Sequence, residues 1–155
     1  MEINGLPLHA LVVHAAVVFT PLAAIAGVLY AAVPTFRDWL RWPLVGLAAV
    51  ALVSIWVAYF SGESVEEANP ASYDPATLPE RADLLETHES RAGVLRISVT
   101  VFALVTFAAA WLHTRTGPVR IGLSAGVGAL AVLTAVYCVL TGDAGAKLAW
   151  DGVQG

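Results

Sequence analysis

Four apolar runs, each close to the length of a membrane-crossing helix, constrain this chain more than any other feature. They cover roughly Leu8–Val33, Trp42–Phe60, Ala92–Leu112 and Val119–Leu140. A helix needs about 20 residues to cross about 30 Å of hydrocarbon, and none of the runs alternates apolar and polar residues as a barrel strand would. The chain is 58% hydrophobic and 13% charged, whereas soluble domains are about 25% charged. The sequence therefore predicts one all-α domain over residues 1–155, an integral membrane four-helix bundle surrounded by a lipid bilayer.

The charges between the runs predict the orientation. The two short connections are basic, with Arg37 and Arg41 in the first and Arg115 and Arg120 in the second, whereas the long connection at about 61–90 is acidic. Short cytoplasmic loops carry an excess of lysine and arginine. We therefore expect both short connections in the cytoplasm, and the acidic loop and both termini on the extracytoplasmic side.

Prolines and glycines predict where the helices begin and how they pack. Pro43 and Pro118 stand where a proline can open a helix, because the missing N–H is not needed there. The long loop has prolines and is expected to be mostly irregular, although Pro79–Ser90 can begin a helix that continues into the third run. Gly122 and Gly126 form a pair of small residues that predicts close approach of the fourth helix to a neighbour.

Ionisable residues gather at one predicted depth. If each helix is counted from its expected cytoplasmic end, one such residue in every helix lies about 24 residues away, or roughly 36 Å, just beyond the hydrocarbon. These residues are His9, Glu63, His88 and Asp143. His14 and Arg96 are expected one to two turns deeper, and Glu67 one turn beyond Glu63 if the second helix continues.

A bound cation would explain such a layer. Neutral imidazole with one or two carboxylates is a common ligand set for zinc, copper, iron or manganese, and facing helices of a bundle are a natural place for it. The proposed ligands are His9, His14 and His88, with carboxylates as further ligands or as acceptors for the histidine N–H groups. Those carboxylates are Glu63, Glu67, Glu89 and Asp143.

Haem b is the competing cofactor. Two imidazoles from the first and third helices, drawn from His9, His14 and His88, could ligate its iron. Arg96 would then be available as a cofactor-binding residue that pairs with a propionate. Against haem, a rim rich in carboxylates is unfavourable for propionates.

Other functions have less support in the sequence. No nucleophile–base pair stands out, and the segment that starts at His88-Glu89 lacks the second histidine of the zinc-protease motif, so an enzyme is not the favoured hypothesis. The net charge of −4 and the lack of a basic patch argue against nucleic acid. A structural accessory subunit without a cofactor, using the acidic loop as a docking surface, is the rival from another class.

Short motifs along nearly the whole chain resemble a known family. They are Gly5-Leu6-Pro7-Leu8-His9 with Val13-His14, Ser61-Gly62-Glu63 with Glu66-Glu67, Thr87-His88-Glu89, and Gly145-Ala146-Lys147-Leu148-Ala149-Trp150 with Gly152-Val153. They are similar to the bacterial membrane family catalogued as domain of unknown function 2231. Departures from its pattern include Ala10 in place of a frequent proline and Ala146 in place of a glycine.

The resemblance implies a multi-pass module of the bacterial cytoplasmic (inner) membrane with no assigned reaction. Relatives of this kind can be joined to Rieske or cytochrome c domains, which implies a redox setting. A redox protein on the extracytoplasmic side and a second copy of the chain in a homo-oligomer are the partners to consider.

Overall fold

A computed structural model describes residues 2–3 and 6–150 of the chain. Four long α-helices make up most of this described part, together with two short 3-10 helices and two antiparallel two-residue strands. The helices are α1 (Leu8–Ala32), α2 (Arg37–Ala68), α3 (Pro79–Trp111) and α4 (Pro118–Trp150). The short elements are β1 (Glu2–Ile3), β2 (Leu6–Pro7), η1 (Pro34–Phe36) and η2 (Pro70–Ser72). The all-α prediction is confirmed.

All of these long helices are apolar and long enough to span a membrane. Helix α3 has 33 residues, which at 1.5 Å per residue is about 50 Å, whereas the hydrocarbon is about 30 Å thick. The apolar part of α3, which begins at Ala92, is therefore long enough by itself to span the hydrocarbon. We expect the charged turns that precede Ala92 to lie beyond the hydrocarbon.

The prediction of a long loop at 61–90 is wrong in extent. Helix α2 continues to Ala68 and α3 begins at Pro79, so the connection covers only 69–78. The segment before Ala68 has no proline and several glutamates, which favour a helix, whereas Pro70 disfavours helical backbone at the residue before it. The predicted helical start at Pro79–Ser90 is confirmed.

Helix α2 also begins earlier than predicted. Pro43 lies inside it rather than at its start. Arg37 explains the early start, because its Nε and Nη2 donate hydrogen bonds of 3.0 Å to the carbonyls of Tyr30 and Ala31 at the end of α1. Those carbonyls lack partners within their own helix, so the side chain links the end of α1 to the beginning of α2.

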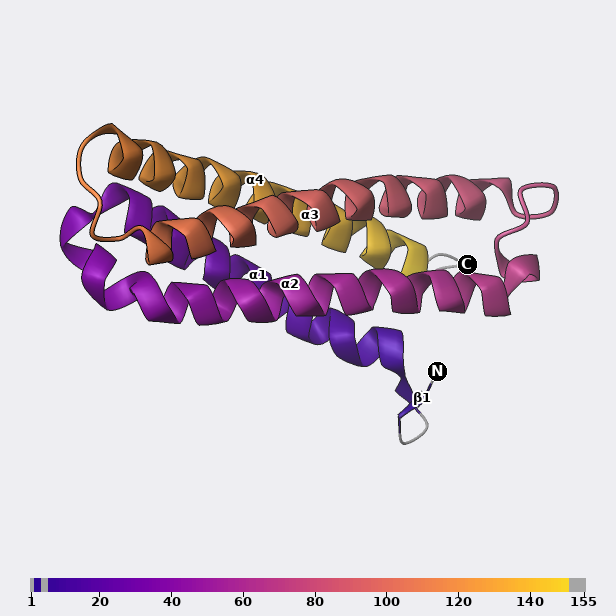
Figure 1. Cartoon of the computed structure of the whole chain (residues 1–155). Coiled ribbons are helices and arrows are strands. Elements are labelled where there is room, and N and C mark those ends of the chain that lie inside the picture. Colours follow the sequence, from indigo (N-terminus) through magenta and orange to yellow (C-terminus); the bar gives the residue numbers. More distant parts are fainter. Residues whose placement is uncertain (1, 4–5, 151–155) are drawn as a thin grey trace.

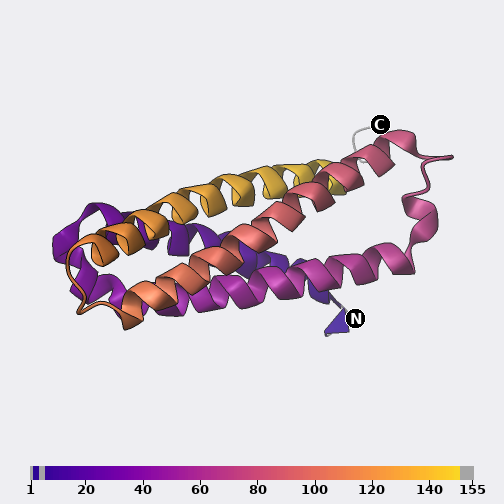
Figure 2. The same cartoon turned by 45° about the horizontal axis from the view of Figure 1, so that its top comes forward.

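The helices form a ring in sequence order. Helix α1 packs against α2 and α4, and α3 packs against the same two neighbours, so α1 and α3 are diagonal across the bundle. Figure 1 shows both termini at the end opposite to the α1–α2 and α3–α4 connections. In Figure 2, turned by 45°, the ends of α2 and α3 that meet at η2 extend past the rest of the bundle. Which end faces the cytoplasm remains a prediction from the charges.

Small side chains fill most of the interior. The core consists largely of alanines, with Phe102 as its largest fully buried side chain. Close approach depends on Gly27, where an added Cβ would lie 2.9 Å from the Phe102 ring, and on Gly128, where it would lie 2.8 Å from the Cβ of Ala31. The predicted pair is not the closest contact: a Cβ at Gly126 would lie 3.4 Å from Val105, and one at Gly122 would meet nothing within 4 Å.

Candidate functional site

His9 lies at the start of α1 and is anchored to α2. Its Nδ1 is 3.0 Å from the carbonyl oxygen of Ala58 and 3.1 Å from Oγ of Ser61. A carbonyl can only accept, so Nδ1 carries the proton and donates it. The ring also rests on Gly62, where an added Cβ would lie 3.2 Å from Cε1. The tautomer and the ring position are therefore both fixed by α2.

His88 lies on α3 and is anchored to α4 in the same way. Its Nδ1 is 3.1 Å from the carbonyl oxygen of Thr141, and an added Cβ at Gly145 would lie 2.9 Å from its Cε1. In both cases the ring donates to a carbonyl and rests on the glycine four residues later in the same helix. The same arrangement of a histidine, a carbonyl and a glycine therefore occurs twice, once between α1 and α2 and once between α3 and α4.

These two histidines lie at the same end of the bundle although their helices are diagonal. A charge on the His9 imidazole acts on His88, so the rings lie within electrostatic range of each other. With Nδ1 protonated, the neutral ring keeps its lone pair on Nε2. Neither Nε2 forms a hydrogen bond with any residue of the described ranges. Each imidazole is therefore oriented by its anchoring helix and offers the Nε2 lone pair as a metal ligand.

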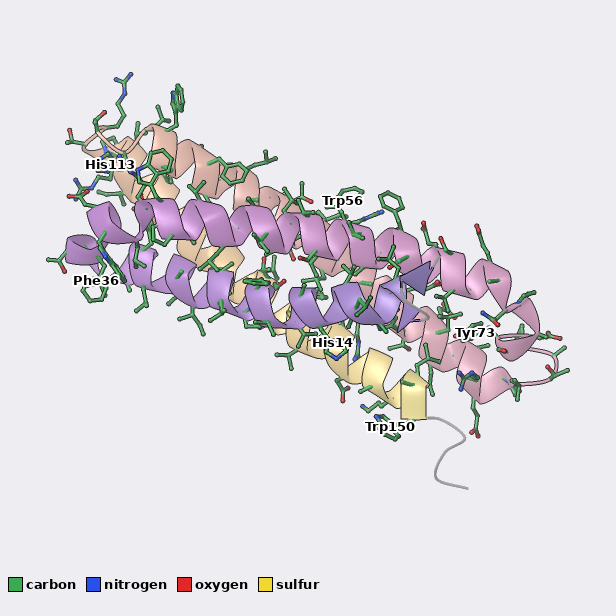
Figure 3. The ribbon with its side chains drawn as sticks, turned by 90° about the horizontal axis from the view of Figure 1, so that it is seen from below. His14, Phe36, Trp56, Tyr73, His113 and Trp150 are labelled. Atoms are coloured by element: carbon green, nitrogen blue, oxygen red, sulfur yellow. The ribbon has the colours of Figure 1, made fainter. Side chains whose placement is uncertain are left out.

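The third proposed histidine, His14, and the proposed arginine, Arg96, have partners of their own. His14 is exposed, and its Nδ1 contacts the carbonyl of Ala10 in its own helix; Figure 3 shows it part-way along α1. Arg96 places its guanidinium 3.9 Å from the centre of the Tyr59 ring and 4.9 Å from that of Trp56. Trp56 is labelled on α2 in Figure 3. Cation–π attraction therefore holds Arg96 against α2.

The carboxylates contact one another and basic groups rather than the histidines. Glu89, which precedes the membrane-spanning segment of α3, is hydrogen-bonded to Glu66 of α2. Partial burial, this hydrogen bond and the charges of Glu66, Glu63 and Glu86 raise the pKa of Glu89 to about 7. Two carboxyl groups that share a hydrogen bond must hold a proton between them, so this pair is partly protonated near neutral pH.

The other carboxylates are solvent-facing. Asp143 forms ion pairs with Lys147 at 2.8 Å and Arg91 at 3.8 Å, and Glu63 and Glu67 are exposed on α2. Within the ranges that the structure describes, no carboxylate forms an ion pair with His9, His14 or His88. Nor do those ranges contain a group of three or more histidine, cysteine, aspartate or glutamate residues arranged to hold a metal ion.

Three residues of this region were not singled out as site residues by the sequence. Gly62 and Gly145 hold the imidazoles, and Glu66 is the partner of Glu89. Both glycines occur in motifs of the family resemblance, which is the signal that could have indicated them. Glu66 could have been found from helical spacing, because it lies three residues after Glu63 and so shares its face.

The comparisons with known proteins place the chain in a family. Neither the curated proteins nor the solved structures contain a match to it. The family model described as "Predicted membrane protein (DUF2231)" matches residues 5–155. Because this match covers nearly the whole chain, the protein belongs to the DUF2231 family of predicted membrane proteins.

Proposed function

We propose that this membrane protein binds one metal centre between His9 and His88, and that the centre is the iron of haem b. The observation that carries the proposal is the repeated arrangement in which each Nδ1 donates to a backbone carbonyl and each Nε2 is left free. Metal-ligating histidines almost always donate their other ring N–H in this way, which fixes the tautomer and orients the ring.

The number of donors favours haem over a plain ion. A structural zinc site takes four protein ligands and a catalytic one takes three, and no such group is assembled in the described part of the chain. Haem iron takes its equatorial nitrogens from the porphyrin and needs only axial ligands from the protein. Two imidazoles would therefore be a complete protein ligand set for haem b and an incomplete one for zinc.

Arg96 also fits this cofactor. The guanidinium is held against Tyr59 and Trp56, and its N–H groups have no acceptor among the described residues. A carboxylate brought by a ligand, such as a propionate, could accept from them. Haem b supplies one-electron chemistry, and the role of this chain's own residues is to ligate and orient the group at one end of the bundle.

An optical spectrum of the detergent-purified protein, as isolated and after dithionite reduction, tests the proposal. We expect a Soret band with sharp reduced α and β bands, which disappear in the His9→Ala/His88→Ala double variant and persist in His14→Ala. Membrane insertion of the double variant should be unchanged.

Elemental analysis of the same samples separates the remaining outcomes. If the protein is colourless but contains stoichiometric zinc or copper, and the double variant loses that metal, the two imidazoles bind a plain metal ion and not haem. A protein that is colourless and metal-free after expression with added haem and metals would overturn the proposal and favour an accessory subunit without a cofactor.

A further inference from the structure

The end of the bundle opposite to the histidines contains a cavity of about 90 Å³. A water molecule needs about 10–15 Å³ of accessible cavity volume, so a group of several heavy atoms fits. The end of α1, the start of α2, the end of α3 and the start of α4 all contribute to its wall. The polar residues of that wall are Tyr30, Arg37, Asp38, His113, Arg120 and Ser124.

Positive charge dominates this cavity. Arg37 and Arg120 line it, and the charge of Arg41 acts, like theirs, on the phenol of Tyr30. Asp38 is the single acid in the wall, and its carboxylate is 3.4 Å from Nδ1 of His113 and 86% exposed. Two guanidinium groups in the wall, with the charge of Arg41 also acting on Tyr30, therefore outweigh one carboxylate that faces solvent.

The arginines retain donors that the described part of the chain does not use. Arg120 is exposed and makes no hydrogen bond or ion pair there. Arg37 uses Nε and Nη2 to bind the end of α1, which leaves Nη1. Arg37 and Arg120 therefore keep N–H groups at the cavity that no described residue accepts from, and an anion from outside the chain could accept them.

Two buried hydroxyl groups in the wall also lack partners. The Tyr30 side chain is 5% exposed and Ser124 is 5% exposed, and both line the cavity. Neither hydroxyl makes a hydrogen bond within residues 6–150. Both hydroxyl oxygens keep some solvent-accessible surface. A ligand in the cavity can therefore reach them. Hydroxyls and guanidinium groups around one small space are the donors that an oxyanion requires.

The surroundings of the cavity indicate its position in the membrane. Trp39, Trp42 and Trp111 are 74%, 63% and 88% exposed in the isolated chain at this end. Exposed tryptophans are enriched at the level of lipid headgroups. Figure 3 shows His113 and Phe36 at this end, opposite to Tyr73 and Trp150. The cavity therefore lies where the phosphate groups of a bilayer are found.

We infer that this cavity is a binding site for a phosphate group, held by Arg37, Arg120 and the hydroxyls of Tyr30 and Ser124. The phosphate can come from the headgroup of an anionic phospholipid or from a soluble phosphate. Basic pockets between transmembrane helices on the cytoplasmic side bind anionic headgroups, and the positive-inside rule assigns this end to the cytoplasm. The site is independent of the histidine pair, so either proposal can fail without the other.

Thermal unfolding of the full chain in detergent, followed by tryptophan fluorescence, tests the site with defined probes. One arm compares dioleoylphosphatidylglycerol with dioleoylphosphatidylcholine in mixed micelles. The other compares sodium phosphate with sodium chloride at equal ionic strength. We expect phosphatidylglycerol, sodium phosphate or both to raise the melting temperature relative to the matched control. A rise with the lipid identifies a headgroup phosphate, and a rise with sodium phosphate identifies a soluble one.

The variants decide whether the cavity is responsible. Arg120→Gln removes one charged donor and should weaken the apparent affinity by about tenfold or more, and Tyr30→Phe should weaken it by several-fold. Arg115→Gln is the matched control, because this exposed arginine of the adjacent α3–α4 connection does not line the cavity. The affinity of this variant should remain that of the wild type. For each variant, the melting temperature with the lipid or phosphate is compared with the melting temperature of the same variant without it. The absence of a probe-dependent rise in both arms would overturn the site. An equal loss of affinity in Arg115→Gln and Arg120→Gln would also overturn it.

Discussion

His9 and His88 lie on helices α1 and α3, which are diagonal in the bundle, yet they are near enough to be coupled: burial lowers the pKa of His88, and a proton on His9 would lower it further. Each ring reaches this position by donating to a carbonyl of the neighbouring helix and resting on a glycine four residues later. The pair is therefore a property of the whole bundle, because all of its helices are needed to hold it.

The glycine beneath His88 should be necessary for cofactor retention. In Gly145→Ala the new Cβ would lie 2.9 Å from Cε1 and 3.1 Å from Nδ1 of the imidazole, so the ring must move and its hydrogen bond to Thr141 is lost. We expect loss of the bound cofactor and a decrease of about 1–3 kcal/mol in the free energy of unfolding. Absorption spectra and thermal unfolding in detergent measure the two effects.

Gly142→Ala is the control for this variant. It adds the same methyl group to the same helix three residues earlier, where nothing lies within 4 Å. Because alanine favours a helix over glycine, Gly142→Ala should be neutral or stabilising and should retain the cofactor. Equal behaviour of the two variants would contradict the assigned role of Gly145.

Close packing of α4 against α1 should depend on Gly128. Its added Cβ would lie 2.8 Å from the Cβ of Ala31, and neither atom can rotate away because both are attached directly to helix backbone. We expect Gly128→Ala to lower the free energy of unfolding by about 1–3 kcal/mol. Gly122→Ala, with open space around it, should not lower it. If the melting temperatures of both variants match the wild type, the close approach at Gly128 is not as described.

The buried hydroxyl of Thr134 should be a cost to stability. Thr134 is fully buried, and its Oγ1 has no hydrogen-bond partner in the described part of the chain. Replacing it with valine removes this unsatisfied group at nearly constant shape, so Thr134→Val should raise the free energy of unfolding by about 1 kcal/mol. If thermal unfolding instead shows a lower free energy of unfolding for Thr134→Val, the hydroxyl has a partner, such as an internal water.

Thr100→Val should have the opposite effect. The Thr100 hydroxyl accepts a 3.0 Å hydrogen bond from Nε1 of Trp56 and donates at 2.7 Å to the carbonyl of Arg96. Valine leaves the indole N–H without an acceptor, and we expect a decrease of roughly 1 kcal/mol in the free energy of unfolding. The same chemical change at two threonines thus gives opposite signs, and thermal unfolding of both variants checks them.

The Glu66–Glu89 pair should make stability depend on pH. The pKa of Glu89 is raised from 4.5 to about 7, so the folded state binds more protons than the unfolded state between these values. The stabilisation from this proton is therefore complete below about pH 4.5 and is lost as the pH rises through about 7. Melting temperatures between pH 5 and 8 should fall with rising pH. This dependence should be weaker in Glu66→Gln, whose neutral amide no longer repels the Glu89 carboxylate, and an unchanged dependence would contradict the coupling.

The extent of the helices was predictable only in part. The apolar runs predict the membrane-spanning segments because burial of the backbone in lipid permits few alternatives to a helix. The polar ends of the helices carry no such constraint. The continuation of α2 to Ala68 and its beginning at Arg37 rest on local helix propensity and on one side chain that caps α1, and these signals are weak in the sequence.

By itself the sequence determined that this chain is an all-α membrane protein and which histidines lie near one level, because hydropathy and the 1.5 Å helical rise depend only on the order of residues. Only the tertiary structure decided which of them meet. His9 and His14 are five residues apart, or about 140° around a helix with 3.6 residues per turn. The packing order of the helices turns His9 toward α2 and leaves His14 exposed. That order follows from contacts between small residues such as Gly27, Gly128 and Ala31, which no periodicity along a single helix reveals.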